Sequence, residues 1–192
     1  TAGNISGSGS ASASNNLTLN ATVGNLSIGN VSAGNVTLNA GNTLTTGNVA
    51  ANIAAGGSAL LTGNNITNSG NVSGANVNVT AAGNLTNSGN ITATNNVSVG
   101  GNLSNTGNIT GLGNTSVTGG TISNNGTLGA AGNTSIAGGN LANNGTIGAA
   151  GNTSVNLTGN AVNNGTIAGT NTNVTAGNIS GSGSASASNN LT

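Results

Sequence analysis

Aliphatic residues recur along the chain in short runs that alternate with polar residues, as in the "NVSV" of residues 96–99. This period of two places successive side chains on opposite faces of a β-strand. A helix would need apolar residues at spacings of three and four, and the abundant Gly, Asn, Thr and Val are poor helix formers. Gly-Asn, Asn-Gly and Ser-Gly pairs separate the runs and are typical of tight turns with positive φ. The pattern predicts many short strands joined by turns.

The runs also repeat at a fixed interval. The phrase "GNLTNSGNIT" of residues 83–92 returns as "GNLSNTGNIT" at residues 101–110, and aligned columns advance in steps of 18 to 20 residues. The first aliphatic column contains Ile66, Leu85, Leu103, Ile122 and Leu141. The second contains Val72, Ile91, Ile109, Leu128, Ile147 and Ile167. The third contains Val79, Val99, Val117, Ile136, Val155 and Val174. A glycine column follows them with Gly70, Gly89, Gly107, Gly126, Gly145 and Gly165.

Three strands and three corners in about nineteen residues predict one coil of an all-β parallel β-helix, or β-solenoid, with about nine to ten coils in the chain. Stacked coils place identical residues next to one another. The asparagine column should then form a hydrogen-bonded ladder; it contains Asn68, Asn87, Asn105, Asn124, Asn143 and Asn163. Hydroxyl residues that follow the inward aliphatics should face solvent by strand alternation; examples are Thr86, Thr92, Ser98, Ser104 and Thr110.

The first sixty residues are less regular, and Gly-Asn pairs in residues 23–36 are five residues apart, which indicates tighter corners in the same solenoid. The segment "GSGSASAS" of residues 7–14 fits either a flexible linker or a thin strand with small inward alanines. Residues 1–18 reappear unchanged as residues 175–192. We therefore expect one solenoid segment over residues 1–192, in which residues 1–174 form one large tandem unit and residues 175–192 begin the next.

The chain uses only eight residue types and contains no Asp, Glu, Lys, Arg, His, Cys, Met, Pro or aromatic residue. General acid–base catalysis and activation of a hydroxyl nucleophile both need a titratable group, so we expect no enzyme. Metal sites lack their usual ligands. Nucleic-acid binding lacks cations and aromatic platforms. We expect no catalytic residue, no cofactor, no metal and no nucleic acid.

Stacked like charges would repel one another at the strand spacing, so a neutral composition suits a solenoid. No apolar run reaches the roughly eighteen residues of a membrane helix, and no membrane insertion is expected. The segment shows no signal peptide, and the absence of cysteine excludes a disulfide framework without identifying the compartment.

Several other interpretations fit parts of the pattern. Gly and Ser in this proportion also occur in disordered low-complexity segments, although these lack aligned aliphatic columns. Neutral, Asn-rich segments can stack as amyloid-like cross-β, which the sequence separates poorly from a solenoid. Arrays of outward hydroxyls could bind ice, but paired Thr-x-Thr is isolated at residues 92–94 and 170–172. The charge-free composition is also compatible with a consensus or artificial sequence.

Asn-x-Ser/Thr sequons recur every six residues in the middle of the chain. They predict possible glycosylation sites at Asn84, Asn90, Asn96, Asn102 and Asn108. A simpler interpretation is that a Gly-Asn corner followed by a strand with an outward hydroxyl creates a sequon each time.

The phrase "GNLTNSGNITATNNVSVGGNLSNTGNIT" of residues 83–110 resembles the repeats of filamentous haemagglutinin-type proteins. The resemblance covers residues 63–174 well and the N-terminal third loosely. These are large bacterial surface or secreted adhesins, and the resemblance implies a right-handed parallel β-helix shaft, two-partner secretion across the outer membrane and an extracellular, cell-surface location. Some relatives carry glycans at sequons, which bears on Asn84 and Asn102. Unlike the family, this chain has no Asp, Lys or aromatic residue.

The expected function is a structural shaft of a giant repetitive extracellular protein, with other copies of itself as partners through end-to-end continuation and lateral association of neutral Asn/Ser/Thr faces. The alternative is an adhesin module that binds carbohydrate of a host or neighbouring cell. Lesser alternatives are an ice-binding or amyloid-like matrix fibre.

Overall fold

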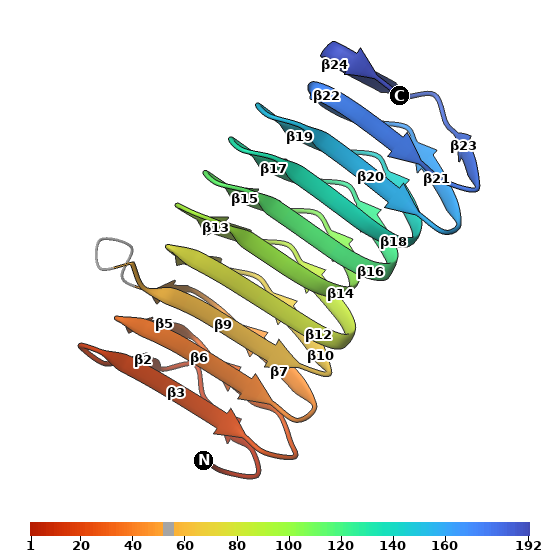
Figure 1. The fold of residues 1–192 in the computed structure, drawn as a ribbon. Coiled ribbons are helices and arrows are strands. Elements are labelled where there is room, and N and C mark those ends of the chain that lie inside the picture. Colours follow the sequence, from red (N-terminus) through yellow and green to blue (C-terminus); the bar gives the residue numbers. More distant parts are fainter. Residues whose placement is uncertain (52–55) are drawn as a thin grey trace.

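The computed structural model describes residues 1–51 and 56–192, and all regular elements in them are β-strands. The strands follow one another around a stack of about ten coils of about nineteen residues, with the two chain ends at opposite ends of the stack (Figure 1). All strand pairs are parallel, and each strand between the first and last coils pairs with strands one coil before and one coil after it. The expected β-solenoid with three strands per coil is confirmed.

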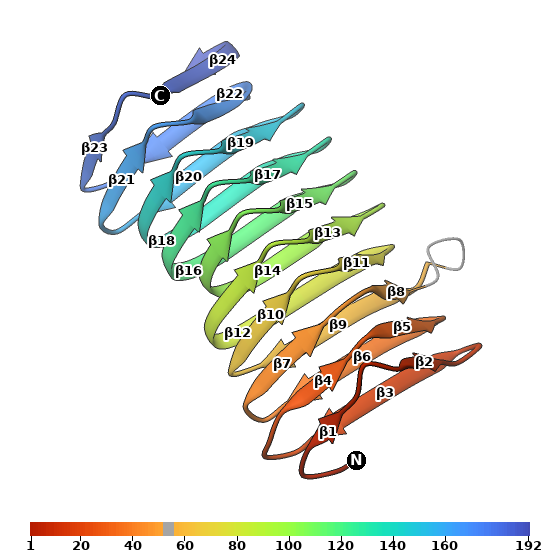
Figure 2. The ribbon, with the colours of Figure 1, turned by 180° about the vertical axis from the view of Figure 1, so that it is seen from behind.

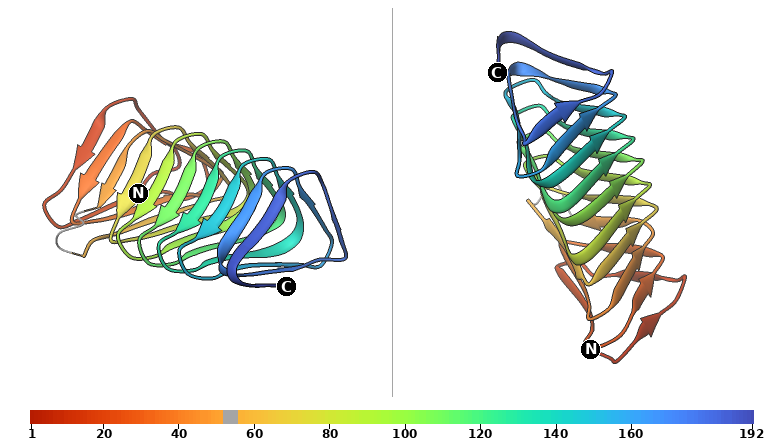
Figure 3. Two further views of the ribbon diagram at one scale, coloured as in Figure 1. Left: turned by 90° about the horizontal axis from the view of Figure 1, so that it is seen from above. Right: turned by 90° about the vertical axis from the view of Figure 1, so that its right-hand side faces the viewer.

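Each coil contributes one strand segment to each of three faces, which Figures 2 and 3 show from behind, from above and from the side. The first face contains β1 (Ile5–Ser6), β4 (Leu26–Ile28), β7 (Thr43–Thr46), β10 (Asn65–Asn68), β21 (Asn160–Asn163) and β23 (Asn178–Ser180). The second face contains β2 (Ser10–Ser12), β5 (Asn30–Ala33), β8 (Val49–Ala51), β11 (Asn71–Gly74), β13 (Asn90–Ala93), β15 (Asn108–Gly111), β17 (Thr127–Ala130) and β19 (Thr146–Ala149). The third face contains β3 (Asn16–Ala21), β6 (Asn35–Ala40), β9 (Ser58–Gly63) and β20 (Thr153–Leu157).

Longer strands continue from one face to the next through a corner. Those that run from the third face into the first face of the following coil are β12 (Asn76–Asn87), β14 (Val97–Asn105), β16 (Thr115–Asn124) and β18 (Thr134–Asn143). Those that run from the second face into the third are β22 (Thr166–Thr175) and β24 (Ser184–Leu191). The strand register shifts at the corners of β12 and β14, where the chain bends without leaving the ladder.

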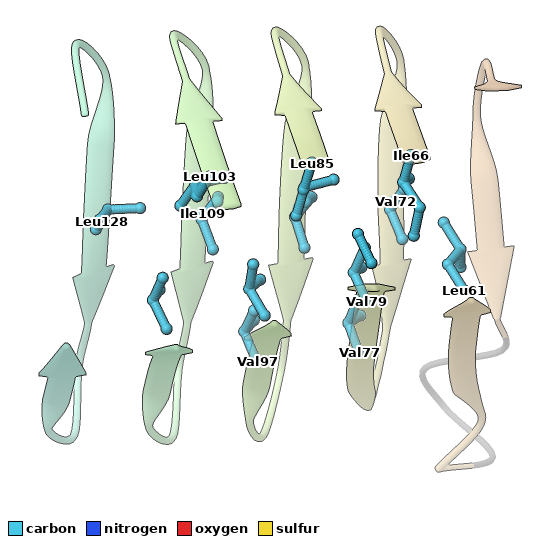
Figure 4. Close-up of a cluster of buried hydrophobic side chains, with 14 of the residues drawn as sticks. Leu61, Ile66, Val72, Val77, Val79, Leu85, Val97, Leu103, Ile109 and Leu128 are labelled. Carbon is cyan, nitrogen blue, oxygen red and sulfur yellow. The ribbon is translucent and has the colours of Figure 1, made fainter. Parts of the chain in front are cut away.

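The aliphatic columns stack in register and form a thin core along the axis (Figure 4). Leu85 pairs with Ile66 on one side and with Leu103 on the other, and all three side chains are buried. Figure 4 shows these side chains pointing between the faces, where they meet Val72 and Ile109 from the second face. Burial of one such side chain contributes about 1.5–3 kcal/mol, so the repeated columns are the main stabilising contribution. The three columns named from the sequence are buried apart from Val174, which is only partly buried because it lies close to the last coil.

The third face carries a second inward column that the sequence analysis missed. Val77 and Val97 are buried beside Val79 and Val99, because alternation turns both valines of each run inward. In later coils the same column is threonine and stays buried; it contains Thr115, Thr134, Thr153 and Thr172. The "NVSV" alternation already contained this signal, since residues two apart share a face.

The corner glycines are needed for a different reason from the one predicted. Among the described residues only Gly56, Gly101 and Gly181 have positive φ, and none of them belongs to the glycine column. Instead, a Cβ atom at Gly107 or Gly126 would collide with the carbonyl oxygen of the corner glycine one coil earlier. The prediction of positive-φ corners for this column is therefore wrong. The column is glycine because the backbones of successive coils approach too closely there for any side chain.

The irregular N-terminal region belongs to the same solenoid, as expected. Within residues 7–14, β2 pairs with β5 and places Ala11 opposite Val31. Ala11 and Ala13 are partly buried, so this segment is the thin strand and not the linker. The expected outward hydroxyls differ among themselves: Thr86, Ser98 and Ser104 are exposed, whereas Thr92 and Thr110 are half-buried in a groove described below.

Candidate functional surfaces

A ladder of asparagine side chains runs inside the solenoid at the corner between the first and second faces. Each side-chain Nδ2 donates to the Oδ1 one coil further on, at 2.7–2.8 Å, from Asn68 through to Asn163. The ladder residues are at least nine-tenths buried, and from Asn68 to Asn143 each Nδ2 also donates to the carbonyl of the corner glycine two residues later, as Asn105 does to Gly107 at 3.0 Å. A buried amide of this kind is stabilising only when its polar atoms are paired.

Both ends of this ladder are closed by other polar groups. The hydroxyl of Thr46 donates to Oδ1 of Asn68 at 3.1 Å, and Nδ2 of Asn163 donates to the carbonyl of Ser184 at 2.9 Å. No buried side-chain nitrogen or oxygen in the described part of the chain lacks a partner. The buried polar groups of the described interior are therefore all paired with other groups of the protein.

The buried threonines form a second internal line of hydrogen bonds. The hydroxyl of Thr134 donates to the carbonyl of Gly148 at 2.7 Å, and Thr115 and Thr153 make the equivalent bonds at 2.6 Å. Each bond joins the third face of one coil to the second face of the next. These threonines thus join the two faces at this corner through their hydroxyl groups.

Asparagines also connect neighbouring coils on the outside. At one corner, Oδ1 of Asn96 accepts the backbone N–H of Asn114 at 2.9 Å, and Asn114 and Asn133 accept from the following coil in the same way. On the second face, the side chain of Asn90 donates to Asn71 and accepts from Asn108. Most outer asparagines therefore have a structural partner one coil away.

This arrangement bears on the five sequons. Asn84, Asn96, Asn102 and Asn108 are exposed, whereas Asn90 is half-buried. The amide groups of Asn90 and Asn108 are hydrogen-bonded to neighbouring coils, and the carbonyl oxygens of Asn96 and Asn102 accept backbone N–H groups. The side chains of four of the five sequon asparagines therefore join neighbouring coils; they are Asn90, Asn96, Asn102 and Asn108.

An open groove of about 550 Å³ lies on the outside of the second face, across β13, β15, β17 and β19. Its centre is hollow because Gly129 and Gly148 lie in register with Thr110 and leave a gap where the neighbouring coil has a side chain. Leu112 lies at its margin and is 67% exposed. The groove offers aliphatic surface and a few hydroxyls, and it contains no charged or aromatic side chain.

No cluster of His, Cys, Asp or Glu occurs among the described residues, in keeping with the composition. None of the elements described is a helix long and apolar enough to cross a membrane. The described surface of the solenoid consists largely of amide, hydroxyl and backbone groups, interrupted by the aliphatic groove and by exposed side chains such as Leu112.

Comparison with known proteins gives no relative: no protein family, no curated protein and no solved structure matches this chain.

Proposed function

We propose that the chain is a structural shaft segment of a giant repetitive protein on the outside of a bacterial cell. The observation that supports this most strongly is the uninterrupted internal ladder from Asn68 to Asn163, flanked by aliphatic columns. Every coil in this stretch makes the same bonds to the next, so length can be added without a new type of contact. Repeated identical contacts of this kind favour a long, uniform rod over a protein built around a single binding site.

The second part of the proposal is self-association. The chain has no charged side chain, so electrostatic repulsion between copies is minimal. Exposed asparagine, serine and threonine side chains repeat along the axis at the coil spacing, and a second rod has the same spacing. Lateral contact could therefore be repeated once per coil, which makes many weak contacts add together.

The shaft is tested by electron microscopy and fibre diffraction of the purified protein. Ten coils at about 4.8 Å per strand spacing correspond to a rod of roughly 50 Å, with a reflection near 4.8 Å along the rod axis. Compact globular particles without this reflection would contradict the proposal. Surface location is tested separately, by labelling intact producing cells with an antibody against the exposed faces.

Lateral association is tested by adding charge to one face. Ser98 and Ser135 are exposed on the third face, and the double substitution Ser98→Lys, Ser135→Lys should reduce sedimentation of bundles, most strongly at low salt. The matched control, Ser98→Gln, Ser135→Gln, keeps the faces neutral and should bundle like the parent. Equal bundling of both variants would exclude the third face as the contact.

A second candidate function, carbohydrate binding, rests on the groove beside Thr110. Its hydroxyls and aliphatic floor could contact a sugar, although the aromatic platforms that stack on sugars are absent. A Cβ at Gly148 would make only ordinary van der Waals contacts, so Gly148→Val should fill the groove while leaving the coil intact. A glycan array positive for the parent and negative for this variant would support an adhesive module, and a blank array for both would support the shaft alone.

A further inference from the structure

Three corners between the first and second faces carry the same four residues, Asn-Asn-Gly-Thr, at residues 124–127, 143–146 and 163–166. In each corner the first asparagine belongs to the buried ladder, and the second is exposed in the bend before the corner glycine. The exposed asparagines are Asn125, Asn144 and Asn164. The two coils before them have a hydroxyl residue at the equivalent position, Ser88 and Thr106. Asn-Gly bonds therefore form part of one outer column.

An Asn-Gly bond is the site at which an asparagine side chain most readily loses its amide. The backbone nitrogen of glycine gives up its proton and bonds to Cγ of the asparagine, the bond from Cγ to Nδ2 breaks, and ammonia leaves. Water then opens the resulting succinimide ring and gives aspartate or isoaspartate, so the net reaction exchanges ammonia for water. Asparagine is among the thermolabile residues of proteins, and glycine has no Cβ to hinder the approach.

The fold restrains the attacking nitrogen at these corners. The N–H of Gly145 donates to the carbonyl of Asn124 at 3.0 Å. The equivalent bond, from the N–H of Gly126 to the carbonyl of Asn105, is longer at 3.2 Å. The attack requires this bond to open, so its rate depends on the local opening of the corner. Gly126 is the less firmly held of the two.

The fold also restrains the asparagine side chains, and to different degrees. Nδ2 of Asn144 donates to Oδ1 of Asn125 at 2.8 Å, and Oδ1 of Asn144 accepts Nδ2 of Asn164 at 3.1 Å. Asn144 is therefore held through both polar atoms. In the described part of the chain the Asn125 side chain is held through Oδ1 alone, and its Nδ2, which would leave as ammonia, donates to no described residue.

We propose that Asn125 is a deamidation site of the folded solenoid, and that the hydrogen bonds of Asn144 to the neighbouring coils retard the same reaction there. The product at Asn125 is ionised at neutral pH, because the ordinary pKa of an aspartate is about 3.9. It would be the first charged side chain in a chain that has none. Isoaspartate would also add a methylene to the backbone next to Gly126, where even a Cβ would collide with Gly107. This site goes beyond the proposed shaft function and does not depend on it.

The repeated tetrapeptide supplies an internal control. In concentrated urea Asn125 and Asn144 should react at equal rates, because both are preceded by Asn and followed by Gly-Thr. In the folded protein at mildly alkaline pH, Asn125 should react about three- to tenfold faster, the effect of one additional hydrogen bond at Asn144. Mass spectrometry of elastase peptides measures the conversion at each site. Isotopically labelled water during the incubation distinguishes this conversion from any that occurs during digestion.

The ratio of the two rates decides between the fold and the local sequence. Equal rates in the folded protein, a faster reaction at Asn144, or the same ratio in urea and in the folded state would overturn the proposal. A folded protein in which Asn125 does not react, although it reacts in urea, would overturn it as well.

Two exposed positions of the same column test the protecting bond. Asn125→Ala removes the acceptor of the Asn144 amide and should raise the rate at Asn144 about three- to tenfold. The matched control is Thr106→Ala, one coil earlier, where the hydroxyl donates to the carbonyl of Asn87; it should leave the rate at Asn144 unchanged. Circular dichroism checks that both variants retain their β-structure. An unchanged rate at Asn144 in Asn125→Ala, or the same increase in both variants, would contradict protection by this bond.

Discussion

The corner between the first and second faces is occupied by different side chains in the first three coils and in the six coils that follow. From Asn68 to Asn163 the corner between the first and second faces is filled by the buried asparagine ladder. In the earlier coils, the register partners in this column are Ile28 and Thr46. The corner thus accepts an apolar side chain or an amide, provided that every amide has a partner. A polar column can stop only at a group that completes its hydrogen bonds, as the hydroxyl of Thr46 does.

The largest expected effect comes from placing a charge in the ladder. Asn105→Asp buries the only titratable side chain of the solenoid, and burial raises the pKa of this carboxyl above the ordinary value of about 3.9. The folded state then holds the proton more tightly than the unfolded state. Stability should be close to that of the parent below about pH 3, and should fall as the pH rises, by about 4 kcal/mol at neutral pH.

Urea unfolding at several pH values measures this effect. The parent should show a flat profile between about pH 3 and 9, because none of its side chains titrates there. Ser104→Asp, at the exposed neighbouring position, should stay within about 0.5 kcal/mol of the parent. A flat profile for Asn105→Asp would mean that the ladder position is not buried.

The next largest effect tests whether a ladder position accepts an apolar side chain, as the same column does at Ile28 near the N-terminus. Asn105→Leu supplies an apolar side chain but leaves Oδ1 of Asn124 without the side-chain donor it has now, and removes one acceptor of Asn87. We expect a loss of about 3 kcal/mol, since unpaired buried polar groups cost about 1–3 kcal/mol each. Thr46→Val, at the end of the ladder, leaves only Oδ1 of Asn68 without its donor and should cost about 1 kcal/mol.

The urea midpoints of Asn105→Leu and Thr46→Val, compared with that of the parent, measure these two losses. Equal losses would contradict the expectation that interrupting the ladder at Asn105, where two ladder bonds are lost, costs more than removing the single end donor at Thr46.

Two glycines of the same coil distinguish a steric requirement for glycine from a requirement for positive φ. Neither Gly126 nor Gly129 has positive φ, but a Cβ at Gly126 would collide with the carbonyl of Gly107, whereas a Cβ at Gly129 meets only ordinary contacts. Gly126→Ala should cost about 1–3 kcal/mol, as overpacking does, and Gly129→Ala should stay within about 0.5 kcal/mol. Thermal unfolding of both variants checks this. Similar stability of the two would contradict close backbone stacking at the corner.

The smallest expected effect concerns the outer asparagines. Asn108→Ala removes the hydrogen bond to Asn90 at 2.9 Å on an exposed face, where water can replace the lost partner. The loss should be below about 1 kcal/mol. A loss as large as that of Asn105→Leu would show that the outer line shares the role of the inner ladder.

Much of the fold could be predicted because every coil repeats the same local pattern. Ile66, Leu85 and Leu103 lie one coil apart in sequence, so periodicity alone brings them into one column. The role of Thr134 could not be predicted, because strand alternation does not show whether a threonine in an inward position finds an acceptor. Its acceptor, the carbonyl of Gly148, lies fourteen residues away on a different face.

The groove could not be predicted either. It arises because Gly129 and Gly148 follow Thr110 in one outward column, and a hollow is visible only when the three coils are stacked. The glycine column shows the same limit: its regularity was evident, but its cause was assigned to φ instead of to backbone crowding.

The sequence by itself determined the coil length, the three-strand coil, the neutral surface and the asparagine column, because each of these depends on residues repeated at one interval. The tertiary structure decided which polar residues are buried, why the corner glycines are required and where the surface is hollow. These properties depend on contacts between coils, where an atom's surroundings are set by the coil above and the coil below. A repeating sequence predicts that coils stack, and only the stacked coils show which atoms meet.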